Sequence, residues 1–310
     1  MLRCCISKSW RQVSKLAEIL SVFVSGIAFG VPLFLVASGL TLIYGVIGVL
    51  NFAHGSLFVV GALVATSILG VTAPSIPLFI LAIIASVVVV GVLGLVTERL
   101  VIRRLYKAEH INMLLATFAV LLLLEGAAEA VWGNVPRNVH RPTELGGNIE
   151  ILGATIPVYY TVLIIAGIIV GIGLWYLIQK TRFGQAVRAI AQDSVMSEAI
   201  GLNSKKMMLL VFGLGSALAG LAGVLMTPNV TVLPSLGHAF ILQSFAVVII
   251  GGLGSIPGSI VAALIVGIVE AFSARYFPVL TGFSFYILVA IILVLRPQGL
   301  LGGAKLGGRH

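Results

Sequence analysis

Long continuous runs of apolar residues, separated by short polar segments, dominate the pattern of the chain. The clearest runs cover residues 75–96, 112–131, 159–178, 208–226 and 283–295. Most of them reach or approach the roughly 20 residues that a helix needs to cross the hydrocarbon core of a bilayer. Their apolar residues are contiguous rather than alternating, which excludes the strands of an outer-membrane barrel. The pattern predicts an all-α, polytopic bundle of transmembrane helices.

Basic residues lie at the ends of these runs and predict their orientation. The segment 180–206 carries five of them: Lys180, Arg182, Arg188, Lys205 and Lys206. A second basic segment covers residues 98–107. Because Lys and Arg beside membrane spans are retained in the cytoplasm, we expect both segments there, with the tail 297–310. The segment 133–157, rich in Gly, Pro and Asn, is then an external loop.

The N-terminal tail, residues 1–18, does not fit this scheme directly. Its basic residues Arg3, Lys8, Arg11 and Lys15 favour a cytoplasmic start. The apolar residues 19–96, however, resemble three crossings, so that either one segment is re-entrant or the N-terminus lies outside. We prefer an external start with about eight spans. Residues 1–310 then form a single transmembrane domain.

One apolar span in each half of the chain is interrupted by glycine, proline or polar residues. The candidate residues for a translocation pathway at these breaks are Asn51, His54, Gly55, Ser56, Gly251, Gly252, Gly254, Ser255 and Pro257. Glycine and proline weaken a helix and free its backbone groups. Irregular backbone at membrane depth is tolerated only where it is buried in protein or lines a water-filled cavity. Paired breaks in two halves are therefore a sequence signature of a transport pathway.

Each break also has a simpler interpretation. Residues 251–258 can form a tight turn between two helices, which is at least as plausible as a substrate-coordinating loop. For the first break we favour helix capping by Asn51 or Ser56 over direct contact with a substrate. The histidines are scattered without the spacing of metal ligands, so no metal site is predicted at His54.

Acidic residues in or near the spans are candidates for a proton relay. Glu125 and Glu129 are four residues apart and share a helix face near the outer end of their span. Glu270 lies near Arg275, and we favour an interfacial ion pair between them, or with a partner subunit, over a relay. A seam of small residues at Gly213, Ser216, Gly220 and Gly223 predicts close helix packing, within the chain or across a dimer.

Composition narrows the class of protein. Hydrophobic residues make up 59% of the chain and charged residues 9%, whereas soluble domains carry about 25% charged residues. The net charge of +9 does not indicate nucleic-acid binding, because the basic residues sit at span ends. No phosphate-cradling G-x-x-x-x-G-K-[ST] motif is present, so the chain is not expected to hydrolyse ATP by itself or to be an enzyme. No cofactor is expected.

The basic segment 180–206 has the periodicity of a folded helix. Val187, Ala191, Val195 and Ala199 recur at four-residue steps, and Gly201 follows as a stop signal. We expect a helix over residues 184–200 with one weakly apolar face turned outward. Such a helix between two spans is suited to dock a soluble partner, although an ordinary basic connector with incidental helicity is the alternative.

The sequence FGQAVRAIAQDSVMSEAIGLN in this segment resembles the cytoplasmic coupling loop of membrane permeases in ATP-binding-cassette importers. GLTLIYGVIGVLNFAHGSLFVVGA at 39–62 and FAVVIIGGLGSIPGSIVAALIVGIVEA at 245–271 resemble the same permeases, those that import branched-chain amino acids and related small polar solutes. The resemblance is closer to the shorter of the two permeases that such importers pair. It implies that these residues couple to the ATPase: Gly184, Arg188, Asp193, Glu198, Ala199, Gly201 and Asn203.

The resemblance also implies about eight spans, ATPase subunits that hydrolyse ATP, a second permease subunit and an external substrate-binding protein. The location it implies is a bacterial cytoplasmic (inner) membrane, in contact with lipid. The chief rival is a secondary transporter or channel that works without ATP, which leaves the folded basic segment unexplained. An intramembrane protease using Ser255 and His238 is a distant third, because His238 is expected in an external loop.

Overall fold

The computed structural model describes residues 2–70, 73–106 and 108–301, with side chains from Lys15 onward. The helices are α1 (Leu2–Ile47), α2 (His54–Leu69), α3 (Ile76–Leu100), α4 (His110–Trp132), α5 (Val158–Lys180), α6 (Arg182–Gln192), α7 (Ser194–Ala199), α8 (Ser204–Met226), α9 (Leu236–Gly251), α10 (Ile256–Tyr276) and α11 (Ser284–Leu295). A hairpin of β1 (Asn148–Ile151) and β2 (Ala154–Pro157) precedes α5. The predicted helical membrane bundle is confirmed.

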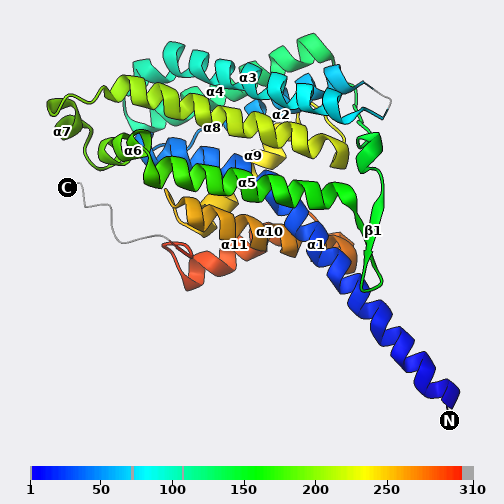
Figure 1. The fold of residues 1–310 in the computed structure, drawn as a ribbon. Helices are drawn as coiled ribbons and strands as arrows, with labels where there is room; N and C mark the ends of the chain where they lie inside the picture. The colour runs from blue at the N-terminus through cyan, green and yellow to red at the C-terminus, as the bar shows by residue number, and fades with distance from the viewer. Residues whose placement is uncertain (1, 71–72, 107, 302–310) are drawn as a thin grey trace.

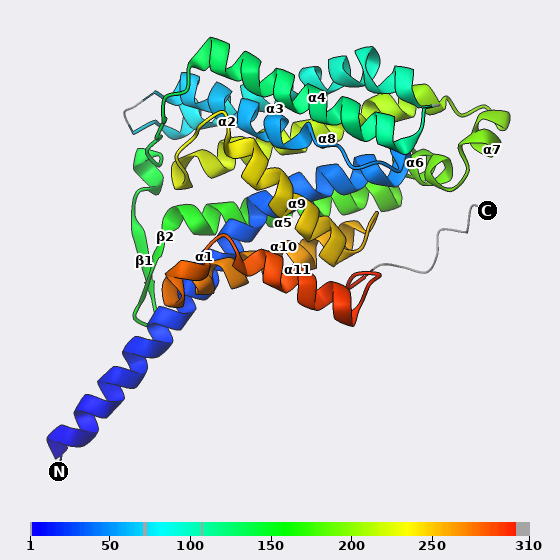
Figure 2. The same ribbon diagram turned by 180° about the vertical axis from the view of Figure 1, so that it is seen from behind.

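Helices α1 and α8 run side by side through the middle of the bundle (Figures 1 and 2), with α1 packed on α10 and α8 packed on α3. Glycines allow this close approach. A Cβ atom added to Gly39 in α1 would lie 2.5 Å from the carbonyl oxygen of Gly215 in α8. The small-residue seam also packs within the chain, since Gly220 lies against Val90 of α3 and Gly223 against Phe58 of α2.

The two ends of the bundle differ in character. Helices α6 and α7 lie at one end, which we call the basic end, and the β-hairpin lies at the other, which we call the hairpin end (Figure 1). Helix α1 enters from the hairpin end, where Gly153 lies beside Ala17. The preferred interpretation, with the N-terminus on the side of the loop 133–157, agrees with this arrangement. The predicted tail 1–18 continues α1 as helix from Leu2.

Six helices of the described part of the chain are long and apolar enough to span a membrane, and three shorter apolar helices, α2, α9 and α11, accompany them. The prediction of about eight spans lies between the six long helices alone and the nine described helices obtained when the three shorter ones are included. The chain returns to the basic end at the C-terminus, where Leu300 N donates to Ile250 O at 2.7 Å. Residues 302–310 of the predicted C-terminal tail lie outside the described residues.

Helices α2 and α9 are short because both begin halfway through the bundle. Ser56, in the first turn of α2, donates to the carbonyl oxygen of Leu121, the midpoint of α4. Gly55 abuts the first turn of α9, since a Cβ atom added to it would lie 2.4 Å from Gly237 O. Irregular segments, residues 48–53 and 230–235, lead to the two helix starts. The structural counterpart of the first break is therefore the segment before α9, and not residues 251–258.

Candidate functional site

The predicted coupling segment is folded, but as two helices instead of one. Asp193 ends α6 and caps α7, because its Oδ1 accepts from the backbone amides of Val195 and Met196 at 2.9 Å each. Asp favours such a cap over a helix interior, so the helix predicted over 184–200 is interrupted there. Gly201 ends α7 with φ +92°, a left-handed conformation that glycine adopts without strain, as predicted.

Helix α6 is fixed tightly to the end of α5. Gly184 is buried so close to α5 that an added Cβ atom would lie 2.1 Å from Ile178 O. The guanidinium of Arg188 donates to the same carbonyl. Val187 and Ile190 are buried against the bundle. The apolar residues of α6 therefore face inward, contrary to the prediction of a single outward apolar face for the whole segment.

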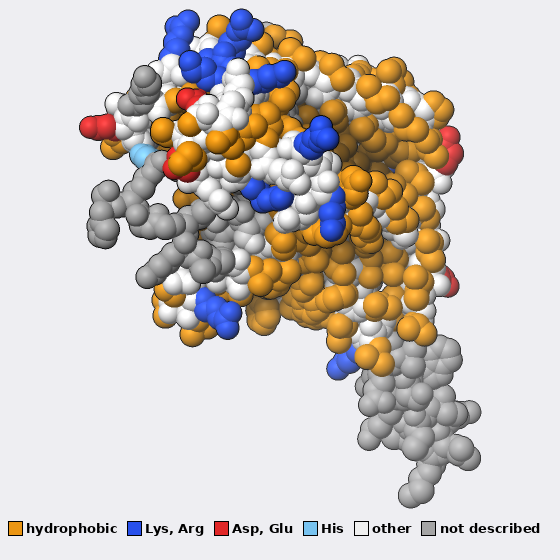
Figure 3. All heavy atoms as spheres, turned by 60° about the vertical axis from the view of Figure 1, so that its left-hand side comes forward, with side chains coloured by type: hydrophobic (Ala, Val, Ile, Leu, Met, Phe, Trp, Pro, Cys, Tyr) orange, Lys and Arg blue, Asp and Glu red, His pale blue; other side chains and the backbone are white. Residues whose placement is uncertain are grey.

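Helix α7, by contrast, turns apolar side chains to the outside. The exposed fraction is 77% for Val195, 62% for Met196 and 70% for Ile200. Glu198 and Ala199 are exposed as well. Lys and Arg side chains gather around this end of the molecule (Figure 3). The outward surface is thus a small apolar patch in basic surroundings.

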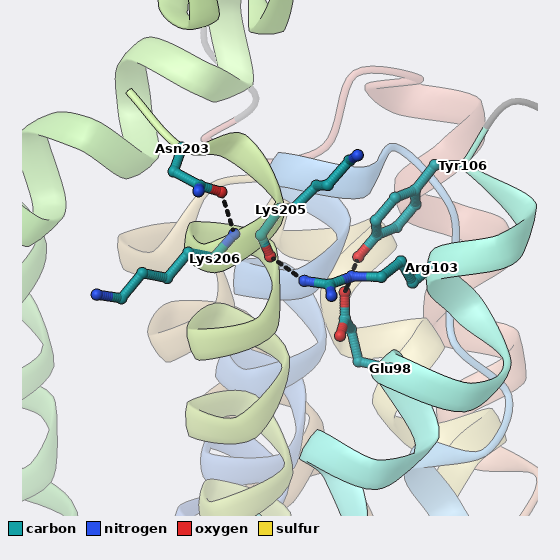
Figure 4. A network of polar contacts seen from close by, with 6 residues as sticks. All are labelled: Glu98, Arg103, Tyr106, Asn203, Lys205 and Lys206. Atoms are coloured by element: carbon teal, nitrogen blue, oxygen red, sulfur yellow. Dashed lines mark hydrogen bonds and ion pairs between the residues drawn. The ribbon is translucent and has the colours of Figure 1, made fainter. Parts of the chain in front are cut away.

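A buried carboxylate ties the end of α3 to the start of α8 (Figure 4). The Glu98 side chain is fully buried, and Tyr106 Oη donates to its Oε1 at 2.6 Å. Arg103 Nε lies 3.5 Å from the same oxygen, and Arg103 Nη2 donates to Lys205 O at 3.1 Å. Asn203 caps α8 beside this network by accepting from Lys206 N. No sequence pattern indicates this network, because its members come from two separate basic segments.

The residues of the first break are buried and support the start of α2. Asn51 Oδ1 accepts from Ala53 N at 3.1 Å, so Asn51 stabilises the turn that leads into α2, but no side chain caps the helix itself. The Ser56 hydroxyl instead donates to the carbonyl oxygen of Leu121 in α4. The Nδ2 atom of Asn51 and both ring nitrogens of His54 are buried without a hydrogen-bond partner among the described residues. His54 lies against Gly39, near the backbone of Val36.

The residues of the second predicted break form the turn between α9 and α10, at the basic end. Ser255 caps α10 by accepting from Gly258 N, with Pro257 in the first turn. Gly252 and Gly254 adopt φ +97° and +84°. This is the tight-turn alternative. The turn borders a cavity of about 470 Å³ between α1, α5 and α6, at the far end of α9 from the first break.

Three phenylalanine rings meet where the chain enters α2. The ring centroid of Phe52 lies 6.0 Å from that of Phe118 in α4 and 5.0 Å from that of Phe245 in α9, both edge to face. Toward the basic end, a cavity of about 450 Å³ is lined by residues that include Tyr44 and Met113. Neither Phe118 nor Phe245 was a predicted site residue. Both lie in apolar helices, where one more aromatic side chain does not stand out in the sequence as a site residue.

The predicted pairing of Glu270 with Arg275 is not found in the structure. Arg275 Nη2 lies 2.6 Å from Glu18 Oε1, so its partner is Glu18 rather than Glu270. Glu270 accepts from Gly282 N at 2.8 Å and from the Ser284 hydroxyl, holding the connection into α11. Among the described residues, no group of three His, Cys, Asp or Glu side chains could hold a metal ion.

His238 was expected in an external loop, and the structure places it in the first turn of α9. Its Nε2 lies 2.7 Å from Glu125 Oε2 in α4. The sequence could not show this pairing, because the two residues are 113 positions apart and the segment before α9 reads as an ordinary loop.

Comparison with known proteins gives a consistent result. Residues 22–295 match the family described as branched-chain amino acid transport system / permease component. The high-affinity branched-chain amino acid transport system permease protein BraD of Pseudomonas aeruginosa is 32% identical, over 91% of this chain and 95% of that protein. The corresponding LivH of Escherichia coli is 30% identical, over 90% and 94%. The ribose import permease protein RbsC of E. coli is 27% identical over 75% and 71%. No solved structure matches the chain.

Proposed function

The chain belongs to the family of branched-chain amino acid transport permease components, and from this we propose that it is a membrane subunit of an ATP-binding-cassette importer. Its cargo is a small polar solute, with branched-chain amino acids first, because BraD and LivH match more of the chain than the ribose permease does. ATP hydrolysis belongs to a separate subunit, and an external binding protein delivers the cargo. The chain is a multi-pass protein of the bacterial cytoplasmic membrane.

The exposed apolar patch of α7 supports the proposal most directly. In this scheme the basic end is cytoplasmic, as the concentration of Lys and Arg favours. Val195, Met196 and Ile200 would lie in water there if nothing covered them. A short helix capped at both ends, presenting apolar side chains outside the membrane, fits the surface of a soluble ATPase. Glu198, Ala199 and Gly201 lie in or beside this patch.

Helix α6 provides the connection from that patch to the membrane. Because Gly184 and Arg188 hold α6 against Ile178, a displacement of α7 by the ATPase moves the end of α5 as well. On the other side of α7, Asn203 starts α8, and Arg103 links that start to α3. The two states of the ATPase can bias the permease only through differential affinity for its conformations, and these contacts transmit the bias.

The pathway follows α4, α9 and the irregular residues 48–53. Asn51, His54, Gly55 and Ser56 organise this region from within, and the rings of Phe52, Phe118 and Phe245 meet beside them. The Gly251–Pro257 turn has a supporting role at the cytoplasmic mouth, where Gly254 lines the 450 Å³ cavity. The open face of α4 and α9 leaves room for a second permease subunit.

Co-purification with candidate ATP-binding-cassette ATPases tests the proposal. The wild-type chain should retain its ATPase in detergent, and the double variant Val195→Asp, Met196→Asp should lose it because two charges replace the apolar contact. Leu152→Asp is the matched control, since Leu152 is 83% exposed at the opposite end of the molecule.

If no ATPase binds the wild type, the importer assignment fails and the ATP-independent transporter replaces it. If the double variant binds as well as the wild type does, α7 is not the docking surface. Elution volume on size exclusion shows in both cases that the membrane fold is retained.

A further inference from the structure

A contact between a carboxylate and an imidazole joins two apolar helices of the bundle. Glu125 in α4 and His238 in α9 approach to 2.7 Å, with side-chain exposed fractions of 16% and 45%. Glu125 is seven residues before the end of α4, about 10 Å inside the hairpin end at the rise of an α-helix. Leu122, on the same face of α4, is 48% exposed. The pair is therefore partly open at membrane depth.

Such a position is costly for ionisable groups unless it faces protein or water. Ionisable side chains within membrane spans face a bundle interior or a water-filled cavity and mark substrate pathways. Within the chain, the side chains of Glu125 and His238 contact each other. Helix α2 packs against both α4 and α9, and both side chains keep an exposed side. This exposed side is the surface along which a solute can pass.

Glu125 and His238 lie on the same helix faces as two of the three phenylalanine rings described above. Phe118 precedes Glu125 by seven residues, and Phe245 follows His238 by seven, so each helix carries both on one face. Because α4 and α9 run in opposite directions, both rings lie on the side of the pair toward the basic end, where Phe52 joins them. The separation is about 10 Å along each helix. On the way from the hairpin end to the basic end, the polar site at Glu125 and His238 therefore comes before the three apolar rings.

We propose that Glu125 and His238 form a binding subsite for the charged backbone groups of a zwitterionic amino acid, above a gate made by Phe52, Phe118 and Phe245. The inference rests on the proposed function and adds the chemical group that the pathway recognises. An arriving zwitterion separates the pair, with its ammonium on the Glu125 carboxylate and its carboxylate on the His238 ring. The contact between the two side chains is exchanged for two contacts with the solute, while the aliphatic side chain faces the rings. A neutral sugar lacks both charges and gains nothing from this exchange.

The test uses thermal unfolding of the purified full-length chain in detergent, with millimolar leucine as the probe. We expect leucine to raise the melting temperature of the wild type and 4-methylpentanoate, which lacks the ammonium group, to leave it unchanged. Glu125→Gln should abolish the shift, because the amide carries no charge for the ammonium group. The amide can still hydrogen-bond His238, so the contact between α4 and α9 is kept. Glu129→Gln, one turn closer to the helix end, is the matched control and should shift as the wild type does.

The proposal is overturned if leucine does not stabilise the wild type, or if it stabilises Glu125→Gln equally. A second measurement is leucine uptake by the importer assembled with its ATPase and binding protein in proteoliposomes. Glu125→Gln should slow uptake about tenfold or more, the effect of losing a charge-assisted hydrogen bond, while ATP hydrolysis stays within about twofold. Normal uptake by Glu125→Gln overturns the subsite alone. Absence of ATP-dependent uptake in the wild type contradicts the proposed function, and leucine-induced stabilisation decides the subsite separately.

Discussion

Glu98 carries a charge into a fully buried position at the end of α3, where an uncompensated carboxylate would be strongly destabilising. Tyr106 and Arg103 compensate it. We expect Tyr106→Phe to lower the free energy of unfolding by about 1–3 kcal/mol, the cost of leaving a buried acceptor without its donor. Melting curves in detergent measure this. Tyr176→Phe, an exposed tyrosine without a described hydrogen bond, is the control, and an equal loss in both variants would contradict the role of the hydroxyl.

The same contact predicts a pH dependence. Burial, and then the hydrogen bond to Glu98, raise the pKa of Tyr106 above its ordinary value. A folded-state pKa above the unfolded one means that the stabilisation is complete below the unfolded pKa, about 10 for tyrosine, and is lost as the pH rises further. The melting difference between wild type and Tyr106→Phe should therefore stay constant from about pH 6 to 9. A difference that does not decline above about pH 10 would contradict the raised pKa of Tyr106 in the folded state.

At the scale of the element, α7 depends on its cap. It has six residues, too few to be stable as an isolated helix, and Asp193 satisfies two of its first amides. We expect Asp193→Ala to cost about 1 kcal/mol of local stability and to weaken ATPase retention. Hydrogen exchange of residues 194–199 should rise. Asn203→Ala removes the cap of the long, packed α8 and should leave exchange in α8 nearly unchanged, so equal fraying of both helices would refute this reasoning.

The junction of α2 and α9 depends on the absence of side chains. A Cβ atom at Gly55 would meet the backbone of Gly237 at 2.4 Å, so Gly55→Ala must push the two helix starts apart. Overpacking of this kind costs about 1–3 kcal/mol, and we expect a lower melting temperature and a poorer yield of monodisperse protein. Gly173→Ala in α5, with no atom within 4 Å of the added methyl, should melt at or above the wild-type temperature. Wild-type melting of Gly55→Ala would disprove the tight junction.

At the scale of the whole molecule, helix α1 begins on the side of the hairpin end, whereas the last described residues, Leu300 and Leu301, bond to Ile250 and Gly251 at the basic end. With the basic end in the cytoplasm, a cysteine at Leu16 or Leu152 should react in intact cells with a membrane-impermeant maleimide. A cysteine at Val195 should react only after permeabilisation. The background for these variants is the chain with Cys4 and Cys5 replaced by Ser. Labelling of Leu16→Cys only after permeabilisation would place the N-terminus inside.

Much of this architecture could be predicted from the sequence, because hydrophobicity is a local property. The span predicted over residues 159–178 lies within two residues of α5 at each end. What could not be predicted depends on tertiary contacts. The four-residue spacing from Val187 to Ala199 continues across Asp193, so the sequence pattern does not indicate the break between α6 and α7. The descent of residues 230–235 to midbundle reads as a surface loop, and the pairing of Glu125 with His238 follows only from that descent.

The meeting of the α2 and α9 starts has a consequence for leakage. Neither helix has a side-chain cap at its first turn, and the positive ends of the two helix dipoles converge midway through the bundle. Such half-helix ends exclude protons and small cations from membrane pores. The membrane potential, negative inside, would otherwise draw those ions through an idle pathway. A zwitterion carries no net charge and meets no comparable barrier, so an importer built on this junction can admit its solute without dissipating the ion gradients of the cell.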